Sequence, residues 1–276
     1  MSQQMLTAAV TMNQLQHKID NIGNNLANMD TSGYKTRNTE FASLLYRQMN
    51  NLSDPANAQG RLTPDGVRTG TGAKAASMNF NFANGTISTT DRPLDTALVR
   101  ENLYYQVQAT QDGDEQTLYT RDGSFYLSPY GEGSLQLTTS DGSPVLGEDG
   151  PIVVEEGFDQ IFINDEGEVV TEQDGENTVV AQLAIVELNR PDLLEASGTN
   201  RFALPDLDEL GFEMNEIVQA PEGTEPVLQS HSIERSNVDT AQQMTDLLTA
   251  QRAYQMNART LSMGDQMMGL VNQLRS

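Results

Sequence analysis

The sequence has no cysteine among its 276 residues, which excludes a disulfide framework, a thiolate metal site and a cysteine nucleophile. Tryptophan is also absent, and aromatic residues make up only 6% of the chain, so a large ligand pocket with aromatic walls is not expected. Basic residues are few, 16 against 39 acidic, and the formal net charge is −23. This excess of carboxylates argues against nucleic acid and against an anionic membrane surface as partners.

Long hydrophobic runs are missing as well. No window approaches the ~20 apolar residues of a membrane span, so direct membrane insertion is not expected. Residues 1–5 lack the basic start and apolar core of a Sec-type signal peptide, and we expect no cleaved signal there. Taken alone, these features are typical of a cytoplasmic protein, but a protein exported without a cleaved signal would share them.

The charge is distributed unevenly along the chain. Residues 76–226 carry 5 basic and 30 acidic side chains, whereas residues 1–75 have a net charge of +2 and residues 227–276 a net charge of zero. Segments that pack against other copies cannot tolerate strong self-repulsion, but a solvent-facing middle can. The acidic excess fits either an outer face that stays soluble or a source that lives at high pH or high salt, and the sequence leaves both open.

Both ends of the chain carry heptad patterns. Near the N-terminus, Met5, Met12, Ile19 and Leu26 are each seven residues apart. A second apolar set follows three residues after each of them: Ala8, Leu15, Ile22 and Met29. This a/d spacing, uninterrupted by proline, predicts a helix over about 3–29 with a seam for another helix.

The C-terminal pattern mirrors the first. Leu247, Tyr254, Leu261 and Met268 are seven residues apart and predict a helix over about 238–274. Ser236 or Asn237 is the expected N-cap. Because neither stripe has another long apolar helix to pack on, we expect the two helices to pair as a coiled coil, with each other and with copies of themselves.

The residues between the helices have a different sequence pattern. Short β-type runs alternate with Asp-Gly turns, which suit the positive φ of tight hairpins. The predicted class is α+β: terminal coiled-coil helices, an extended connector and an inserted antiparallel β domain. The expected segments are the N-terminal helix and turn, the connector, the acidic β domain and the C-terminal helix, at 1–35, 36–84, 85–226 and 227–276.

Several motifs resemble the flagellar basal-body rod and hook protein family. Residues 24–35 read Asn-Asn-Leu-Ala-Asn-Met-Asp-Thr-Ser-Gly-Tyr-Lys and are similar to its N-terminal signature. Segments similar to its β region and its C-terminal signature follow in the family's order, at 92–98, 119–125, 141–152, 234–239 and 250–255. One departure is Glu-Asn-Leu-Tyr-Tyr at 101–105, where the family usually has Gly-x-Gly-Phe-Phe.

The resemblance implies a structural subunit of the bacterial flagellar rod, not an enzyme, that polymerises into a helical tube through its terminal helices. It implies a role in flagellum assembly and motility, and export without a cleaved signal through the flagellum-specific (type III) route. The implied partners are copies of itself, other rod and hook proteins and the export apparatus, and the implied location is the basal body. The length suits a rod protein better than a hook protein, and proximal and distal positions both stay open.

The residues expected to serve assembly are the two heptad seams together with Gly33, Tyr34 and Asn237. Residues 28–33 predict a helix stop and a turn in which Gly33 takes positive φ. For each of these positions, an ordinary contact within the chain is the alternative interpretation.

Other kinds of site find little support. His17 and His231 are the only histidines and have no partners at zinc spacing, and the Asp-Gly pairs do not follow a calcium-loop pattern. Glu155-Glu156 is one of many adjacent acids expected by chance in so acidic a region. We therefore expect no metal, no cofactor and no catalytic residues. A coiled-coil adaptor and a secreted β-rich hydrolase are the competing functions, and the hydrolase lacks a recognisable nucleophile and base.

Overall fold

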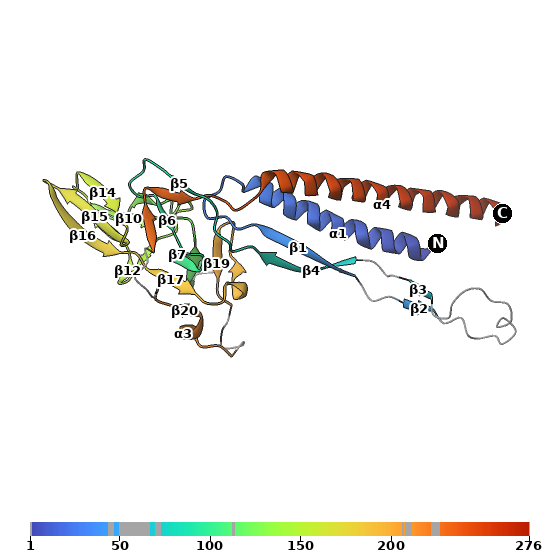
Figure 1. Ribbon diagram of the computed structural model, residues 1–276, viewed down its shortest axis with the longest axis horizontal. Helices are drawn as coiled ribbons and strands as arrows, with labels where there is room; N and C mark the ends of the chain where they lie inside the picture. The colour runs from blue at the N-terminus through green and yellow to red at the C-terminus, as the bar shows by residue number, and fades with distance from the viewer. Residues whose placement is uncertain are drawn as a thin grey trace. The chain divides into compact units, whose positions relative to one another are not determined.

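A computed structural model describes residues 2–43, 47–49, 67–69, 73–111, 114–205, 207, 211–221 and 227–275 (Figure 1). The chain divides into two compact units. Unit 1 consists of Met1–Asn25, Arg37–Asn79 and Thr240–Ser276, and unit 2 of Leu26–Thr36 and Phe80–Asp239. Both units are therefore assembled from segments that are distant in the sequence.

Unit 1 contains the two long helices that the heptads predict, α1 (Ser2–Ala27) and α4 (Thr240–Arg275). They lie side by side and antiparallel (Figure 1). Near one end of the pair the Asn25 side chain donates a hydrogen bond to Gln243 Oε1 at 3.2 Å, and near the other Met5 lies against Gly264. The predicted helices are thus confirmed, while the coiled-coil supercoil stays a prediction.

Unit 1 also contains two ribbons of paired strands. Strand β1 (Arg37–Ser43) pairs with β4 (Ala73–Phe80), and β2 (Arg47–Met49) pairs antiparallel with β3 (Val67–Thr69). The described residues of the region expected to be a connector are therefore largely extended.

Unit 2 is a set of small antiparallel sheets, which confirms the inserted antiparallel β domain. The largest has the order β18-β19-β8-β7-β17-β20. Its strands are β18 (Glu195–Ala196), β19 (Arg201–Ala203), β8 (Asp114–Thr120), β7 (Leu103–Gln111), β17 (Ile185–Leu188) and β20 (Val218–Gln219).

In the described part of unit 2, two three-stranded sheets, three strand pairs and short helices accompany the largest sheet. The sheets contain β9 (Tyr126–Pro129), β10 (Ser134–Thr138) and β13 (Val153–Glu155), and β14 (Gln160–Ile163), β15 (Glu168–Gln173) and β16 (Glu176–Gln182). The pairs are β5 (Ile87–Thr89) with β22 (Ser232–Glu234), β6 (Thr96–Leu98) with β21 (Leu228–Ser230), and β11 (Leu146–Gly147) with β12 (Gly150–Pro151). The helices are η2 (Pro191–Leu193) and α3 (Met214–Ile217).

The core of unit 2 lies on both faces of strand β7. Leu103, Tyr105 and Val107 join one apolar cluster, and Tyr104 joins a second cluster with Phe202. Since successive side chains of a strand point to opposite faces, a strand covered on both sides needs consecutive apolar residues, and Leu-Tyr-Tyr at 103–105 provides them here. Each large side chain buried in this way contributes roughly 1.5–3 kcal/mol to the free energy of folding.

The departure at 101–105 is accommodated without glycine. Residues 101–102 form a turn into β7, and the only described non-glycine residues with positive φ are Asp174 and His231. The turn therefore does not need the conformations that favour glycine. Tyr104 and Tyr105 after it are fully buried.

Candidate functional site

The apolar faces of the terminal helices are only partly covered within the chain. The expected seam residues Met5, Met12, Ile19 and Leu26 are half-buried, and on α4 so are Leu247, Tyr254 and Leu261, whereas Met268 is exposed. Among the side chains of these helices that the structure describes, the buried apolar ones are few: Ala8, Ile22 and Ala250. A single chain thus leaves much of the predicted seam in contact with water.

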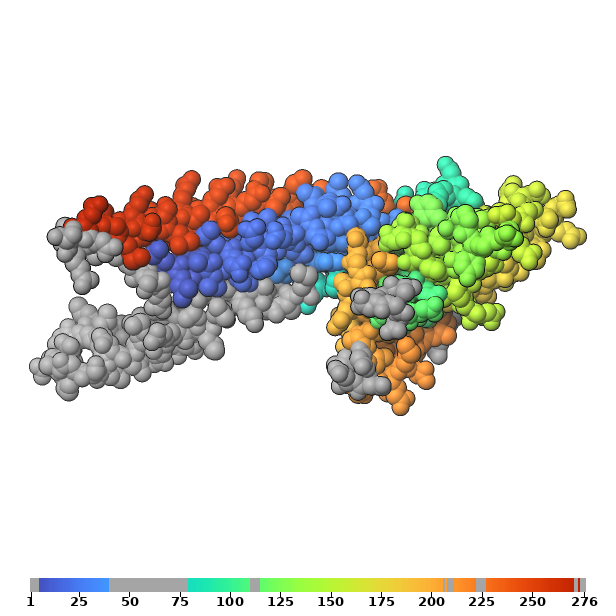
Figure 2. All heavy atoms as spheres, turned by 180° about the vertical axis from the view of Figure 1, so that it is seen from behind, coloured from blue at the N-terminus to red at the C-terminus, as the bar shows by residue number. Residues whose placement is uncertain are grey.

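Other large apolar residues of the helices are more exposed than the seam itself. Leu6 is 67% exposed and Met256 is 65% exposed. Further exposed residues of this kind on α4 are Met244, Leu248, Met263, Met267 and Leu270. Figure 2 shows the side chains of α4, in red and orange, projecting along the helix. Met256, Met263, Met267 and Leu270 were missed because they lie outside the predicted seam of Leu247, Tyr254, Leu261 and Met268. Their spacings of seven, four and three residues from Met256 to Leu270 are the signal that would have found them.

A hollow of about 360 Å³ lies between the helices near the end of α4. Its lining includes Met5 of α1 and Met263, Met267 and Leu270 of α4. A Cβ atom at Gly264 would come within 3.0 Å of Met5 Cγ, so the glycine lets the two helices approach each other there. The hollow is apolar and adds to the surface that another apolar side chain could cover.

Unit 2 contains a buried ionic cluster, which we call the clasp: Lys35, Arg121 and Glu234. The Glu234 carboxylate accepts hydrogen bonds from Lys35 Nζ at 2.8 Å and from Arg121 Nε at 2.7 Å. It also accepts one from the backbone N–H of Gly85 at 2.8 Å. All three charged side chains are at most 1% exposed. The clasp joins the segment after α1, the turn after β8 and strand β22, which precedes α4.

Backbone carbonyls hold the two cations of the clasp in place. The Arg121 guanidinium donates further hydrogen bonds to the carbonyl oxygens of residues 98, 100, 101 and 103. Lys35 Nζ donates to the carbonyl oxygen of Ala83 at 2.8 Å. These neutral acceptors satisfy the donors but do not balance the charge, which only Glu234 does at hydrogen-bond distance among the described residues.

The electrostatics of the clasp are those of two cations and one anion removed from water. Burial lowers the pKa of Lys35 from 10.5 to about 8, and the nearby Arg121 charge adds to the effect while Glu234 opposes it. Burial by itself would raise the pKa of Glu234, but the charges of Arg121 and Lys35 and the hydrogen bonds outweigh it and lower that pKa. The carboxylate therefore stays ionised, and Lys35 is the member whose charge is least stable.

Around the clasp, the segment that follows α1 and the segment that precedes α4 are hydrogen-bonded to each other. The Gly33 N–H donates to the Glu234 carbonyl at 2.9 Å. Asn237 Oδ1 accepts from the N–H and the hydroxyl of Thr36 at 2.8 and 2.6 Å, and Asn237 Nδ2 donates to the carbonyls of Asn81 and Ala83. This arrangement corrects the expected N-cap: α4 begins at Thr240, and the Asn237 side chain bonds to other segments of unit 2 instead.

Gly33 has the positive φ that the sequence predicted, 67°, in the turn after α1. Tyr34 beside it is 1% exposed. In the single chain, Gly33, Tyr34 and Asn237 make contacts within unit 2, and their contribution to packing between copies stays a prediction.

Asn25 forms a second polar cluster, within unit 1, at a position for which the sequence predicts no role of its own. Its side-chain amide donates to the Arg37 carbonyl at 2.9 Å and accepts from the Arg37 N–H at 3.0 Å. Asn21, one turn earlier, donates to the same carbonyl and to Thr39. The signal that could have found the cluster is a pair of asparagines four residues apart beside the buried Ile22.

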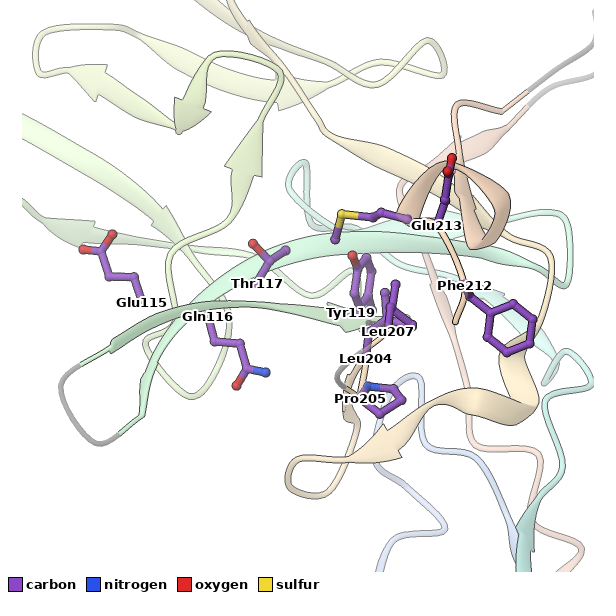
Figure 3. Close-up of a pocket in the computed structure, with 10 residues that line it drawn as sticks. Glu115, Gln116, Thr117, Tyr119, Leu204, Pro205, Leu207, Phe212 and Glu213 are labelled. Atoms are coloured by element: carbon purple, nitrogen blue, oxygen red, sulfur yellow. The ribbon is translucent and has the colours of Figure 1, made fainter. Parts of the chain in front are cut away.

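Unit 2 also has an open pocket of about 630 Å³ (Figure 3). Tyr119, Leu204 and Leu207 gather in it, while the carboxylates of Glu115 and Glu213 point away from this group (Figure 3). The pocket therefore offers apolar contact next to negative charge. Within the described residues, no group of three or more potential metal ligands comes together, and no helix is both long and apolar enough to cross a membrane.

Three protein-family models match separate parts of the chain. Residues 5–35 match the model described as flagella basal body rod protein. Residues 100–171 match the flagellar hook protein FlgE/F/G D1 domain, and residues 229–274 match the flagellar basal body rod FlgEFG protein C-terminal model. Each member of the clasp comes from a different matched segment.

Relatives match the chain from end to end. The flagellar hook-basal body complex protein FlhP of Bacillus subtilis (strain 168) is 40% identical over 283 residues, which cover 100% of both chains. The flagellar basal-body rod protein FlgG of Caulobacter vibrioides is 34% identical, with 99% of this chain and 100% of the relative covered. FlgG of Borreliella burgdorferi is 33% identical, with 100% and 99% covered. The chain therefore belongs to the flagellar basal-body rod protein family, whose members are structural proteins of the flagellum and not enzymes.

Proposed function

We propose that this rod-type structural subunit polymerises into a helical tube by packing α1 and α4 against the same helices of neighbouring copies. It acts in the flagellar basal body, together with other rod and hook proteins. The observation that carries the proposal is the set of large apolar side chains that α1 and α4 leave exposed in a single chain. A surface that meets a different surface on the next copy, without ring closure, generates a filament.

The heptad seams suggest how the helices pack. Met5, Met12, Ile19 and Leu26 on one helix, and Leu247, Tyr254, Leu261 and Met268 on the other, repeat at the spacing of coiled-coil knobs. All eight are half-buried or exposed in the single chain, so neighbouring helices would bury them further. In this proposal the seams form coiled-coil contacts within and between copies.

Export fits the same proposal. An amphipathic helix with an uncovered apolar face is marginally stable in water, and burial against neighbours supplies the missing free energy. A subunit of this kind passes the flagellar export apparatus unfolded, without a cleaved signal, and its ends become ordered on assembly.

Introducing a negative charge on the exposed apolar face of α4 tests the proposal. We expect Met256→Glu to abolish swimming when it replaces the wild-type gene, because a carboxylate at a helix–helix contact is costly to bury. The matched control is Gln255→Glu, at the exposed neighbouring position, which should swim normally. Both purified variants should unfold as the wild type does, because both positions are exposed in the single chain.

Swimming on soft agar and electron microscopy of isolated basal bodies provide the readouts. Complete rods in the Met256→Glu strain would contradict packing through this face. Normal flagella after deletion of the gene would contradict the structural role in flagellum assembly itself.

A further inference from the structure

We infer that the clasp is a charge-balancing lock that makes the folding of unit 2 depend on both chain segments that adjoin the terminal helices. Lys35 lies in the segment that follows α1, and Glu234 lies in strand β22, six residues before α4 begins at Thr240. Arg121 belongs to the β region between them. The three side chains meet only when segments almost 200 residues apart in the sequence have come together.

The lock depends on charge and not only on hydrogen bonds. Without Glu234, the two cations Lys35 and Arg121 would face each other in a site with no exposed surface. Their remaining partners are neutral carbonyl groups, which leave the charges uncompensated. Removing one partner of a buried ion pair is strongly destabilising for this reason. The β region therefore cannot close stably around Arg121 until strand β22 has supplied its carboxylate.

Backbone contacts reinforce the dependence on Glu234. Its carboxylate also accepts the Gly85 N–H, and its own carbonyl accepts the Gly33 N–H. A Cβ atom at Gly85 would come within 1.8 Å of the Arg235 carbonyl oxygen, so the two backbone segments approach closely there. Strand β22 thus supplies the Glu234 carboxylate and the backbone acceptor for Gly33 at the same time. The folding of the β region and the docking of β22 are therefore cooperative. If the export proposed above occurs, unit 2 completes its fold only after its C-terminal segment has emerged, and this consequence alone rests on that proposal.

The test is a charge cycle on the purified full-length chain, followed by urea denaturation at pH 7. Glu234→Gln keeps the shape and an acceptor oxygen but removes the charge, and we expect the unfolding equilibrium constant to rise about a hundredfold or more. Lys35→Met removes the whole ammonium group, whereas Glu234→Gln removes only a charge. We nevertheless expect a smaller rise of the unfolding equilibrium constant for Lys35→Met, because the charges of Arg121 and Glu234 still balance each other. The double variant should be more stable than Glu234→Gln alone, because it contains one uncompensated cation fewer.

The control is Glu187→Gln in the Arg100–Glu187 pair, whose groups lie 3.4 Å apart and are about a quarter exposed. We expect a change of no more than about fivefold there, as for other solvent-accessible pairs. The inference is overturned if Lys35→Met is as damaging as Glu234→Gln, or if the double variant is no more stable than Glu234→Gln. Should Glu234→Gln fail to fold, a folded Lys35→Met chain still supports the lock, and an unfolded one contradicts it. Because all measurements use purified chain, they do not depend on whether the chain assembles or is exported.

Discussion

Gly33 has two independent reasons to be glycine. Its φ of 67° lies in the left-handed region, and a Cβ atom would lie 2.5 Å from the Asp122 backbone nitrogen. Either fact alone would disfavour a side chain, and together they leave no relaxed alternative at this position.

We therefore expect Gly33→Ala to destabilise unit 2 by at least about 2 kcal/mol in urea denaturation. The matched control is Gly23→Ala in α1, where nothing lies within 4 Å of an added Cβ. That variant should be more helical, with a gain of about 0.5–1 kcal/mol. An unchanged urea midpoint for Gly33→Ala would show that the turn can relax.

The neighbouring tyrosines of β7 differ in how their hydroxyl groups are satisfied. The Tyr105 hydroxyl is 2.8 Å from Thr96 Oγ1, whereas the Tyr104 hydroxyl has no hydrogen-bond partner among the described residues. Both side chains are fully buried. The family's usual phenylalanine would therefore suit position 104 better than position 105.

Thermal unfolding of two single variants tests this difference. We expect Tyr105→Phe to lower the free energy of unfolding by about 1 kcal/mol, because the Thr96 hydroxyl is left without its partner. Tyr104→Phe should be neutral or slightly stabilising, since it removes a buried hydroxyl that is unpaired. A larger loss for Tyr104→Phe than for Tyr105→Phe would contradict the assignment.

At the scale of elements, Asn25 links helix α1 to the start of β1. Its amide exchanges two hydrogen bonds with the backbone of Arg37 and donates a third to Gln243 of α4. The side chain is 1% exposed, so water does not replace these bonds when they are lost.

We expect Asn25→Ala to raise the hydrogen-exchange rate of the Arg37 amide by at least about tenfold, which corresponds to the loss of roughly 1.4 kcal/mol of protection. The control, Asn13→Ala, lies at an exposed position of α1 and should leave that rate unchanged. Equal exchange rates in the wild type and Asn25→Ala would mean that Asn25 does not hold the strand.

The sequence predicted the elements better than it predicted their junctions. Heptads give α1 and α4 to within two residues of their observed ends, because local periodicity carries that information. Asn237 was misassigned as a candidate cap because its real partners, Thr36 and Asn81, lie far away in the sequence.

The clasp could not be predicted for the same reason. Lys35, Arg121 and Glu234 each lie inside a motif, but nothing local selects them from 16 basic and 39 acidic residues. Pairing of distant charges is set by the three-dimensional fold, whereas the positive φ of Gly33 followed from its own turn. Met256, Met263 and Met267 of α4 were likewise overlooked because they lie outside the predicted seam of Leu247, Tyr254, Leu261 and Met268.

For the molecule as a whole, the clasp predicts an unusual alkaline response. The pKa of Lys35 is lowered from 10.5 to about 8 in the folded chain, so between these values the unfolded chain binds more protons. Folding stability therefore increases as the pH rises through this window. The charged and titratable groups that act on Lys35 are Arg121, Glu234 and Glu101, and Tyr104 lies beside Arg121.

Comparison of the wild type with Lys35→Met isolates this effect, since both chains share all other titrating groups, including the tyrosines whose pKa is raised by burial. From pH 7 to pH 10, the wild type should gain up to roughly 3 kcal/mol relative to the variant. Urea denaturation at several pH values measures the difference. Parallel stability curves for the two chains would show that Lys35 is not desolvated.

The acidic region 76–226 has only five basic residues, all of them arginines with partners in the same unit. Arg92 and Arg201 pair with Asp95 and Asp141, Arg100 and Arg121 pair with Glu187 and Glu234, and Arg190 lies over the Phe212 ring. The charge that this region presents to its surroundings is therefore strongly negative. The repulsion between the region's carboxylates and other anionic surfaces decays over about one Debye length, ~8 Å at physiological ionic strength. Filaments of the proposed kind, with this region facing outward, should resist bundling in dilute buffer and aggregate when multivalent cations bridge their carboxylates.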